Sequence, residues 1–158
     1  MNRLFISHFT APFASLALVH DGTALWQVHF NPAATSEPWP EADMPAWLSG
    51  PLHAYLEGDL DALAHLPLHL EGTPFQLQVW EALRRIPGGS AWSYARLASA
   101  IGNPRACRAV GSANGCNPAG LIVPCHRVIA ADGRLGGYSG GLEIKRWLLW
   151  HEGVAFRE

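Results

Sequence analysis

The 158-residue chain contains no uninterrupted apolar stretch of the roughly 18 residues that a membrane-spanning helix needs. Its first residues alternate between polar and apolar types, without the long apolar region and cleavage site of a secretion signal. We therefore expect a cytoplasmic protein with no membrane partner. Charged residues make up only 15% and hydrophobic residues 49%, which is enough for one good core or two small ones.

Cysteine is scarce. The chain has three cysteines, Cys107, Cys116 and Cys125, all near the C-terminus. An odd number without the spacing of a disulfide scaffold excludes a small disulfide-stapled fold and favours reduced thiols. One of these thiols is a candidate for chemistry.

Basic residues are almost absent from the first half. Residues 1–72 contain one basic residue and eight acidic ones, a net charge of −7, whereas residues 73–158 carry a net charge of +5. The first half should avoid DNA, and the second half can meet phosphates. The alternative is the ordinary variation of charge along a chain.

Apolar residues in the first half follow a strand period. Residues 15–20 and 24–30 flank Asp21-Gly22, a pair typical of two-residue hairpin turns. We predict a β-hairpin there. Residues 31–40 are rich in proline, serine and alanine and have the composition of a loop.

A helix and a further strand are expected before the second half begins. Residues 44–57 place three leucines and a tyrosine on one helical face, and Pro51 should begin or kink this helix. Leucines alternate through residues 66–70, where a proline restricts the predicted strand to a sheet edge. We interpret Glu71-Gly72 as the boundary between an N-terminal domain, residues 1–72, and a C-terminal domain, residues 73–158.

The second half opens with clear helix signals. Thr73 and Gln76 form a capping-box pair, with a proline at the first helical position. Apolar residues then continue on one face. Gly88-Gly89 is expected to end this helix.

Residues 94–101 and 105–113 form two short helical patterns separated by Gly-Asn-Pro, which predicts a helix-turn-helix. The exposed side of the second helix lacks bulk, and its glycine lowers the helix propensity. Such a side can enter a groove narrower than the major groove of B-DNA, and tight packing against another helix is the alternative. The small residues are Ala106, Ala109, Gly111, Ser112 and Ala113.

A Cys-His-Arg cluster interrupts the apolar, strand-like segment 122–129. Burying such groups costs free energy unless they have partners or a function. Neighbours such as His126, Arg127 and a helix N-terminus lower the pKa of a thiol and so activate it. Cys125 is therefore a candidate nucleophile. The alternative is a small buried cysteine beside a core histidine with satisfied hydrogen bonds.

Ordered motifs carry a resemblance to a known family. Pro124-Cys125-His126-Arg127-Val128 matches the active-site motif of the O6-alkylguanine-DNA alkyltransferases, and the chain resembles the stand-alone bacterial members. Over residues 1–65 the likeness is in outline only. Further matching motifs are Gly72-Thr73-Pro74-Phe75, Gly102-Asn103-Pro104, Arg108-Ala109-Val110-Gly111, Asn117-Pro118, residues 137–141 and His151-Glu152-Gly153.

The resemblance implies DNA repair by direct reversal of damage. The alkyl group of O6-alkylguanine, and of O4-alkylthymine, would move irreversibly from flipped-out DNA to Cys125. The implied catalytic set adds His126, which takes the thiol proton through a water, Glu152, which orients His126, and Tyr94, which hydrogen-bonds the base. No cofactor is expected, and one turnover should exhaust each molecule.

The resemblance also implies how DNA is held. The partner would be double-stranded DNA containing O6-alkylguanine, bound in the minor groove by a monomer. Arg108 would fill the space that the flipped nucleotide vacates, and Tyr94 would crowd the phosphate of that nucleotide. The implied groove-facing residues of the second helix are Ala106, Ala109, Gly111 and Ala113.

The pocket for the flipped base is implied by five positions. The backbone carbonyls of Cys125 and Val128 would accept from the exocyclic amine of guanine, and the Ser139 N–H would contact O6. Asn117 would tie the recognition helix to the active-site segment. The implied pocket residues are Asn117, Val128, Gly137, Tyr138 and Ser139.

The implied fold class is α+β. A ribonuclease-H-like α/β domain with a small antiparallel sheet would precede a helical, winged-helix-like domain with the helix-turn-helix. Some family members hold a structural zinc in the N-terminal domain through cysteines and histidines. This half has six histidines and no cysteine, so we predict no metal. We interpret Cys107 and Cys116 as space-filling residues, with reaction toward alkylating agents as the alternative.

Three rival functions stay open at this point. A non-catalytic damage-binding relative carries tryptophan at the reactive position, and Cys125 argues against it. A cysteine hydrolase needs an oxyanion hole and would leave Arg108 without a purpose. A transcription regulator would explain the helix-turn-helix but not the Cys-His-Arg cluster.

Overall fold

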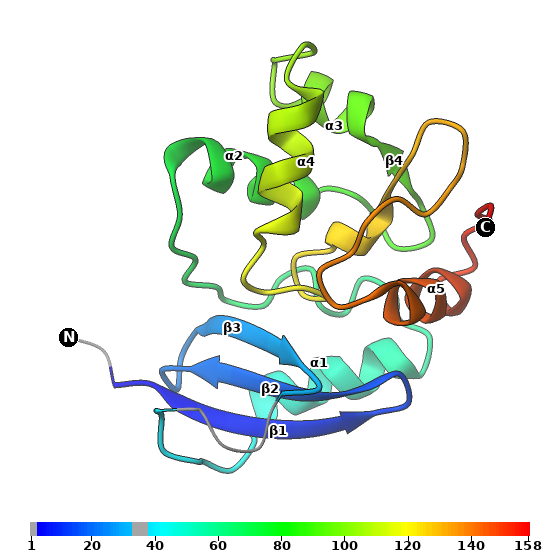
Figure 1. The fold of residues 1–158 in the computed structure, drawn as a ribbon. Helices are drawn as coiled ribbons and strands as arrows, with labels where there is room; N and C mark the ends of the chain where they lie inside the picture. The colour runs from blue at the N-terminus through cyan, green and yellow to red at the C-terminus, as the bar shows by residue number, and fades with distance from the viewer. Residues whose placement is uncertain (1–2, 33–37) are drawn as a thin grey trace.

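A computed structural model describes residues 3–32 and 38–158 (Figure 1). This part of the chain is a mixed α/β fold with a small antiparallel sheet and five α-helices. None of its helices is long and apolar enough to cross a membrane. The elements are β1 (Phe5–Ala11), β2 (Ala14–His20), β3 (Leu25–Phe30), α1 (Ala46–Leu56), α2 (Pro74–Leu83), β4 (Trp92–Ser93), α3 (Tyr94–Ala100), α4 (Cys107–Gly115), η1 (Cys125–Arg127), β5 (Val128–Ile129) and α5 (Leu142–His151).

The predicted hairpin is confirmed as β2 and β3, which pair antiparallel. The predicted length of its turn was wrong, because four residues rather than two connect the strands. The Asp21 carboxylate closes this turn by accepting from the backbone N–H groups of Thr23 and Ala24. Strand β1, which pairs along the whole of β2, was missed. Its buried Ser7 breaks the alternation that would have revealed a strand. The predicted loop 31–40 is described only at its ends, since residues 33–37 lie outside the described residues.

Helix α1 covers one face of the sheet (Figure 1) and presents the expected face, with Leu48, Leu52 and Tyr55 buried. One of the two alternatives for Pro51, that it begins this helix, is wrong. Helix α1 starts at Ala46 and contains Pro51. The expected edge strand 66–70 was also wrong. Only a single parallel bridge forms there, between Leu68 and Leu25 of β3.

The capping-box prediction for α2 is confirmed on both sides. The Thr73 hydroxyl accepts from the Gln76 backbone at 3.1 Å, and the Gln76 side chain accepts from the Thr73 backbone at 2.9 Å. The helix nevertheless ends at Leu83, before Gly88-Gly89. The remaining apolar residue of the pattern, Ile86, is buried in a turn instead of a helix.

The two helices around the Gly-Asn-Pro turn form α3 and α4, which pack on each other and on α2 (Figure 1). Segment 122–129 is not a continuous strand as its composition suggested. The Cys-His-Arg cluster forms η1, a short 3-10 helix. Only Val128–Ile129 remains extended, in a parallel pair with β4. The strand is short because the polar cluster turns inward toward its own partners.

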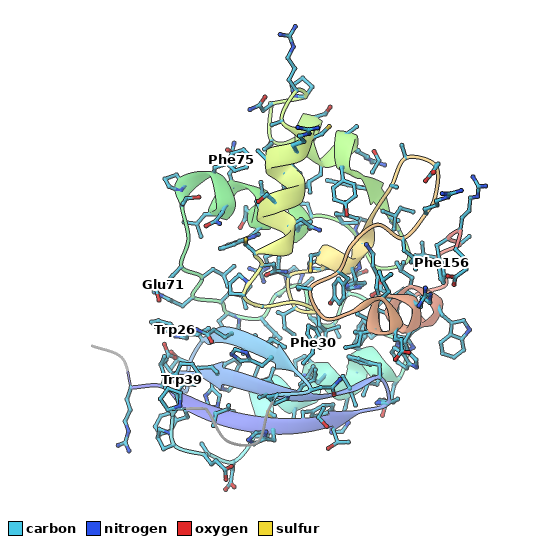
Figure 2. The ribbon with its side chains drawn as sticks, in the orientation of Figure 1. Trp26, Phe30, Trp39, Glu71, Phe75 and Phe156 are labelled. Carbon is cyan, nitrogen blue, oxygen red and sulfur yellow. The ribbon has the colours of Figure 1, made fainter. Side chains whose placement is uncertain are left out.

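One large core joins the sheet to the helices, with residues from β2 and β3 through to α5. Strand β3 is also tied directly to the second half, because Val28 donates its N–H to the carbonyl of Pro118 at 2.9 Å. Figure 2 shows Phe30, the last residue of β3, between the sheet and the segments above it. The N-terminal half also reaches the Cys-His-Arg cluster itself, because Arg127 donates to the carbonyl of Leu60 at 2.9 Å.

Candidate active site

The three side chains of η1 are buried, with Cys125 1% exposed, His126 0% and Arg127 5%. The segment is fixed from both ends. Before it, the Asn117 amide donates to the carbonyl of Val123 at 2.8 Å, and after it β5 pairs with β4. Buried polar groups are expected to have partners, and His126 and Arg127 both have them, apart from Nδ1 of His126.

Glu152, at the C-terminal end of α5, is the centre of a buried network. Its Oε2 accepts from His126 Nε2 at 2.6 Å and from the Tyr55 hydroxyl at 2.6 Å, and its Oε1 accepts from Arg127 Nε at 2.7 Å. Burial opposes ionisation of the carboxyl group, but the hydrogen bonds from His126 and Arg127 and the charge of Arg127 lower the pKa of Glu152 to about 2. Glu152 is therefore a carboxylate at neutral pH.

The ionised Glu152 fixes the tautomer of His126. A carboxylate only accepts hydrogen bonds, so Nε2 of His126 carries the hydrogen and Nδ1 has a free lone pair. Nδ1 is buried and has no hydrogen-bond partner among the described residues. Burial, against the pull of Glu152, lowers the pKa of His126, so the ring is neutral and able to accept a proton at Nδ1.

Cys125 does not rest as a thiolate. Burial raises the pKa of its thiol, and the nearby Asn117 amide, the charge of Lys145 and the nearby Tyr138 hydroxyl offset part of this effect. This direction is opposite to the lowering that the neighbouring His126 and Arg127 suggested. The physical reason is that the Arg127 guanidinium donates to Glu152 and to the backbone carbonyls of Ile86 and Leu60, and not to the thiol.

Lys145 of α5 holds the loop that follows β5. Its Nζ donates to the carbonyls of Val128 at 2.7 Å and Gly137 at 3.0 Å, and also to that of Leu135. Burial lowers the pKa of Lys145 to about 8. At pH 7 it is still mostly an ammonium group, whose three hydrogens match three carbonyl acceptors.

Two tyrosines lie beside the thiol. Burial raises the pKa of both Tyr94 and Tyr138, so both hydroxyls stay protonated at neutral pH. Gly136 allows the loop to approach Tyr94. Its φ is +70°, and an added Cβ would lie 2.9 Å from the Tyr94 hydroxyl. A larger residue at 136 would push the loop away from Tyr94.

Helix α4 presents a mixed surface. Arg108 and Ala109 are exposed, and Ala106 and Gly111 are partly exposed, as a groove-facing side requires. Ala113 is 3% exposed and belongs to the core, where its carbonyl accepts from Trp80 Nε1 at 2.9 Å. The interpretation of Ala113 as a groove-facing residue is therefore wrong, and the alternative, tight packing against another helix, applies at this position.

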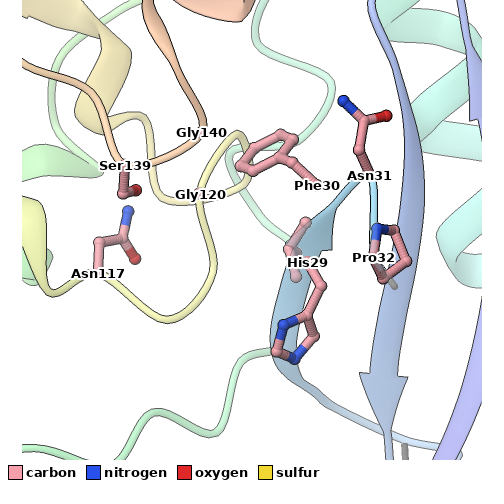
Figure 3. Close-up of a pocket in the computed structure, with 9 residues that line it drawn as sticks. His29, Phe30, Asn31, Pro32, Asn117, Gly120, Ser139 and Gly140 are labelled. Atoms are coloured by element: carbon pink, nitrogen blue, oxygen red, sulfur yellow. The ribbon is translucent and has the colours of Figure 1, made fainter. Parts of the chain in front are cut away.

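A pocket of about 440 Å³ opens beside this cluster, between the end of β3 and the active-site segments (Figure 3). Phe30 reaches across it, and a Cβ at Gly120 or at Gly140 would lie 2.9 Å from the Phe30 ring. The pocket adjoins the thiol and does not include it. Its lining residues are Val28, His29, Phe30, Asn31, Pro32, Asn117, Gly120, Ser139 and Gly140.

The predicted residues fall into two groups in space. Arg108, Ala109, Gly111 and Ala113 lie on α4, and Ala106 immediately precedes this helix. The others surround the thiol or line the adjoining pocket and loop; they are Cys125, His126, Glu152, Tyr94, Asn117, Val128, Gly137, Tyr138 and Ser139.

Four contributors to this region had no role in it, or another role, in the sequence-based predictions. Tyr55 reaches Glu152 across 97 positions of sequence, and nothing local signals that contact. Lys145 gave a weak signal as the only lysine, and Arg127 was assigned to the thiol instead of Glu152. Phe30 ended a predicted strand without any indication of what it faces.

Among the residues that the structure describes, no group of three or more histidine, cysteine, aspartate or glutamate side chains could hold a metal ion. The chemistry that these residues can perform is proton transfer and nucleophilic attack. A buried thiol, a neutral imidazole held by a carboxylate, and two phenol donors are the parts of a cysteine nucleophile that acts on a group enclosed with it.

Comparisons with known proteins agree with this chemistry. Residues 74–154 match the family described as "6-O-methylguanine DNA methyltransferase, DNA binding domain". A methylated-DNA–protein-cysteine methyltransferase of Haemophilus influenzae is 37% identical over 99% of this chain and 90% of its own length. One of the same name from Shigella flexneri is 50% identical over 71% of this chain, and the match spans 66% of that relative.

Solved structures extend the likeness to the whole fold. The crystal structure of Mycobacterium tuberculosis OGT in complex with DNA superposes with a TM-score of 0.82 at 39% identity, covering 94% of this chain and 92% of the other. The matched family covers half of the chain, and the Haemophilus relative covers nearly all of it. This chain is therefore a member of the 6-O-methylguanine DNA methyltransferase family.

Proposed function

We propose that this protein repairs DNA by moving the alkyl group of O6-alkylguanine, or of O4-alkylthymine, onto its own Cys125, irreversibly and once per molecule. The observation that carries the proposal is the buried Cys125 thiol beside His126, whose Nε2 is held by Glu152 and whose Nδ1 is left to accept a proton. The names of the Haemophilus and Shigella relatives support the same activity.

The reaction is an in-line displacement at the alkyl carbon. As Sγ of Cys125 forms its bond to that carbon, the carbon–O6 bond breaks and guanine leaves. The thiol proton passes through a water to Nδ1 of His126, whose imidazolium Glu152 stabilises. An equivalent proton reaches the departing guanine, and the protonated Tyr94 hydroxyl would be a donor for it. The product is a thioether, and none of the described residues around Cys125 is a second nucleophile that could remove the alkyl group.

The buried thiol with a raised pKa fits this course of reaction. A resting thiolate would be exposed to other electrophiles, whereas a buried neutral thiol loses its proton only as the alkyl group enters. Positioning of the reactants then supplies most of the rate. Extruding a base costs a few kcal/mol, and less when alkylation has weakened its pairing, which favours damaged over normal guanine.

Recognition of guanine would use backbone groups. The carbonyl of Cys125 accepts the N–H of Val128, and the carbonyl of Val128 accepts Lys145 Nζ. A carbonyl oxygen has two lone pairs, so each of them can accept a second hydrogen bond, from the exocyclic amine of guanine. Ser139, which is exposed at the pocket, would offer its N–H to O6, and Asn117 would tie the base pocket to α4.

The DNA partner and the finer architecture belong to the same proposal. Helix α4 would enter the minor groove of double-stranded DNA, and Arg108 would insert into the base stack. The small side chains of Ala106, Ala109 and Gly111 would let the helix backbone approach the DNA closely. The DNA in the Mycobacterium tuberculosis crystal structure and the charge of +5 on residues 73–158 support a DNA partner. The proposal includes a ribonuclease-H-like domain of residues 1–72, a winged-helix-like domain of residues 73–158, a monomer and a cytoplasmic location.

Intact-protein mass tests the function directly. The protein is incubated with an excess of duplex DNA that contains one O6-methylguanine, and the methylated peptide is then mapped. We expect one added methyl group per molecule, located on Cys125, with no further addition over time. An unchanged mass with the DNA still bound would reject alkyl transfer, and turnover of an ester substrate would favour a cysteine hydrolase.

Arg108→Ala is expected to slow repair of duplex DNA about tenfold, because the flipped nucleotide loses the side chain that fills its place and extrusion itself costs a few kcal/mol. The same variant should react with a free O6-alkylguanine base at the unaltered rate, since no extrusion is needed. Single-turnover rates on both substrates check this. Arg85→Ala, which removes an equal charge from an exposed position just beyond the end of α2, is the control and should change neither rate.

A further inference from the structure

One oxygen of Glu152 serves both halves of the chain. Oε2 accepts from His126 Nε2 and from the Tyr55 hydroxyl, each at 2.6 Å, while Arg127 takes the other oxygen. Tyr55 is 1% exposed and comes from α1, in the N-terminal half. The N-terminal half therefore supplies a hydrogen bond to the carboxylate that controls the active-site histidine.

The position of the Tyr55 hydroxyl is fixed. Its helix is packed under the sheet by Leu48 and Leu52, and its backbone carbonyl accepts from His151 Nε2 at 2.8 Å. The ring of Tyr55 lies 5.0 Å from that of His151, which stacks on Trp147. Because both its backbone and its ring are held, the hydroxyl stays directed at Glu152.

The Tyr55 hydroxyl stays a donor throughout the reaction. Burial, followed by the charge of Glu152, raises the pKa of Tyr55, so the phenol does not ionise in the working pH range. The other ionisable groups that face His126 and Glu152 are Arg127 from η1, Lys145 from α5, and the neighbouring Cys125 and Tyr138. None of these four groups donates to Oε2 of Glu152, which is the oxygen that Tyr55 shares with His126.

A second donor on Oε2 weakens the hold of Glu152 on the imidazolium of His126. The hydrogen bond from Tyr55 draws negative charge away from the side of the carboxylate that His126 contacts. His126 is then less basic than it would be beside an unshared carboxylate. A less basic His126 is still unprotonated, and so able to accept the thiol proton, at a lower pH.

We propose that Tyr55 is a positioning residue that sets the basicity of His126 through Glu152, and that the N-terminal half thereby tunes the alkyl transfer. The inference rests on the proposed function. Tyr55 touches neither the alkyl group nor the base. Its effect should therefore appear in the pH dependence of transfer rather than in the affinity for DNA.

Tyr55→Phe keeps the ring and removes the hydroxyl. We expect the acid limb of the single-turnover rate of methyl transfer to move to higher pH by about half a unit to one unit. A whole charge-assisted hydrogen bond corresponds to about 1 to 2 units, and only part of it is felt because Tyr55 donates to Glu152 in both protonation states of His126. Above that limb the rate should be close to that of the parent protein. The affinity for unmodified duplex DNA should not change.

The control is Trp47→Phe, which removes another hydrogen bond of α1, from the indole N–H to the carbonyl of Gly22. This bond is not part of the hydrogen-bond network around Glu152. It should leave the pH profile in place. A fluorinated tyrosine at position 55 donates more strongly and should move the acid limb the other way. An acid limb that coincides for the parent and Tyr55→Phe would overturn the proposal.

Titration of the His126 ring by NMR, without DNA, separates this inference from the proposed function. If the parent protein transfers no methyl group, the proposed function fails whatever Tyr55 does. The pKa of His126 should still be higher in Tyr55→Phe than in the parent. An equal pKa in both proteins would reject the role of Tyr55 even if alkyl transfer is established.

Discussion

Cys125→Ala is expected to abolish alkyl transfer down to the background of the assay while leaving the protein folded and able to bind DNA. The Cys125 thiol is buried and adjoins His126 in the chain, and alanine removes its sulfur while adding no new atoms to the core. The measurement is the methyl content of DNA and protein after mixing with duplex containing O6-methylguanine. The DNA should keep its methyl group and stay bound to the variant.

The other two thiols supply the control. Cys107 begins α4 and donates to the carbonyl of Pro104, and Cys116 is exposed just after this helix, so neither belongs to the hydrogen-bond network of Glu152. A Cys107→Ser, Cys116→Ser double variant should transfer the methyl group at the rate of the parent protein. If Cys125→Ala gains a methyl group on either remaining cysteine, the assignment of the nucleophile is wrong.

Local signals explain which parts of the fold could be predicted. The capping box at Thr73 and the Gly-Asn-Pro turn are each encoded within a few residues, and both α2 and the α3–α4 pair form as expected. The end of α2 was misplaced because a buried Ile86 extends the apolar pattern past the last helical residue. Strand β1 was missed because its Ser7 is buried through a hydrogen bond to His20, a partner on another strand.

The candidate site shows the same limit. The nucleophile, its histidine and the loop residues were named because they lie in contiguous motifs. The direction of the Cys125 pKa was wrong, because the sequence places Arg127 two residues from the thiol while the fold turns its guanidinium to Glu152. Tyr55 could not be assigned from sequence, since its partner is 97 positions away. Partners brought together by tertiary packing have no local pattern.

Glu152→Gln is expected to lower the free energy of unfolding at pH 7 by about 3 to 5 kcal/mol, the usual effect of removing one partner of a buried ion pair. The variant leaves the Arg127 guanidinium buried opposite a neutral amide, and the amide can no longer accept from all three donors. Methyl transfer should slow by about 10²-fold or more, because His126 loses the anion that stabilises its protonated form. Urea unfolding and single-turnover rates measure the two effects.

The pH dependence identifies Glu152 as the cause. The pKa of Glu152 is depressed in the folded protein to about 2 from 4.5, so its stabilisation is fully present above pH 4.5 and is lost as the pH falls through 2. The difference in unfolding free energy between the parent and Glu152→Gln should therefore shrink by about 2 kcal/mol between pH 7 and pH 3. Other carboxyl groups titrate in both proteins and cancel in this difference.

Removing both charges should be less harmful than removing one. In the Glu152→Gln, Arg127→Met double variant no unpaired guanidinium remains, so we expect it to unfold at a higher urea concentration than Glu152→Gln alone, although the carbonyls of Ile86 and Leu60 lose their donors. Its methyl transfer should stay as slow as that of Glu152→Gln, because His126 is still without its anion. Stability regained without activity would separate the structural role of the ion pair from the positioning of His126. Equal losses of stability in the single and double variants would instead mean that Arg127 is held chiefly by the two carbonyls, with Glu152 contributing little beyond its contact with His126.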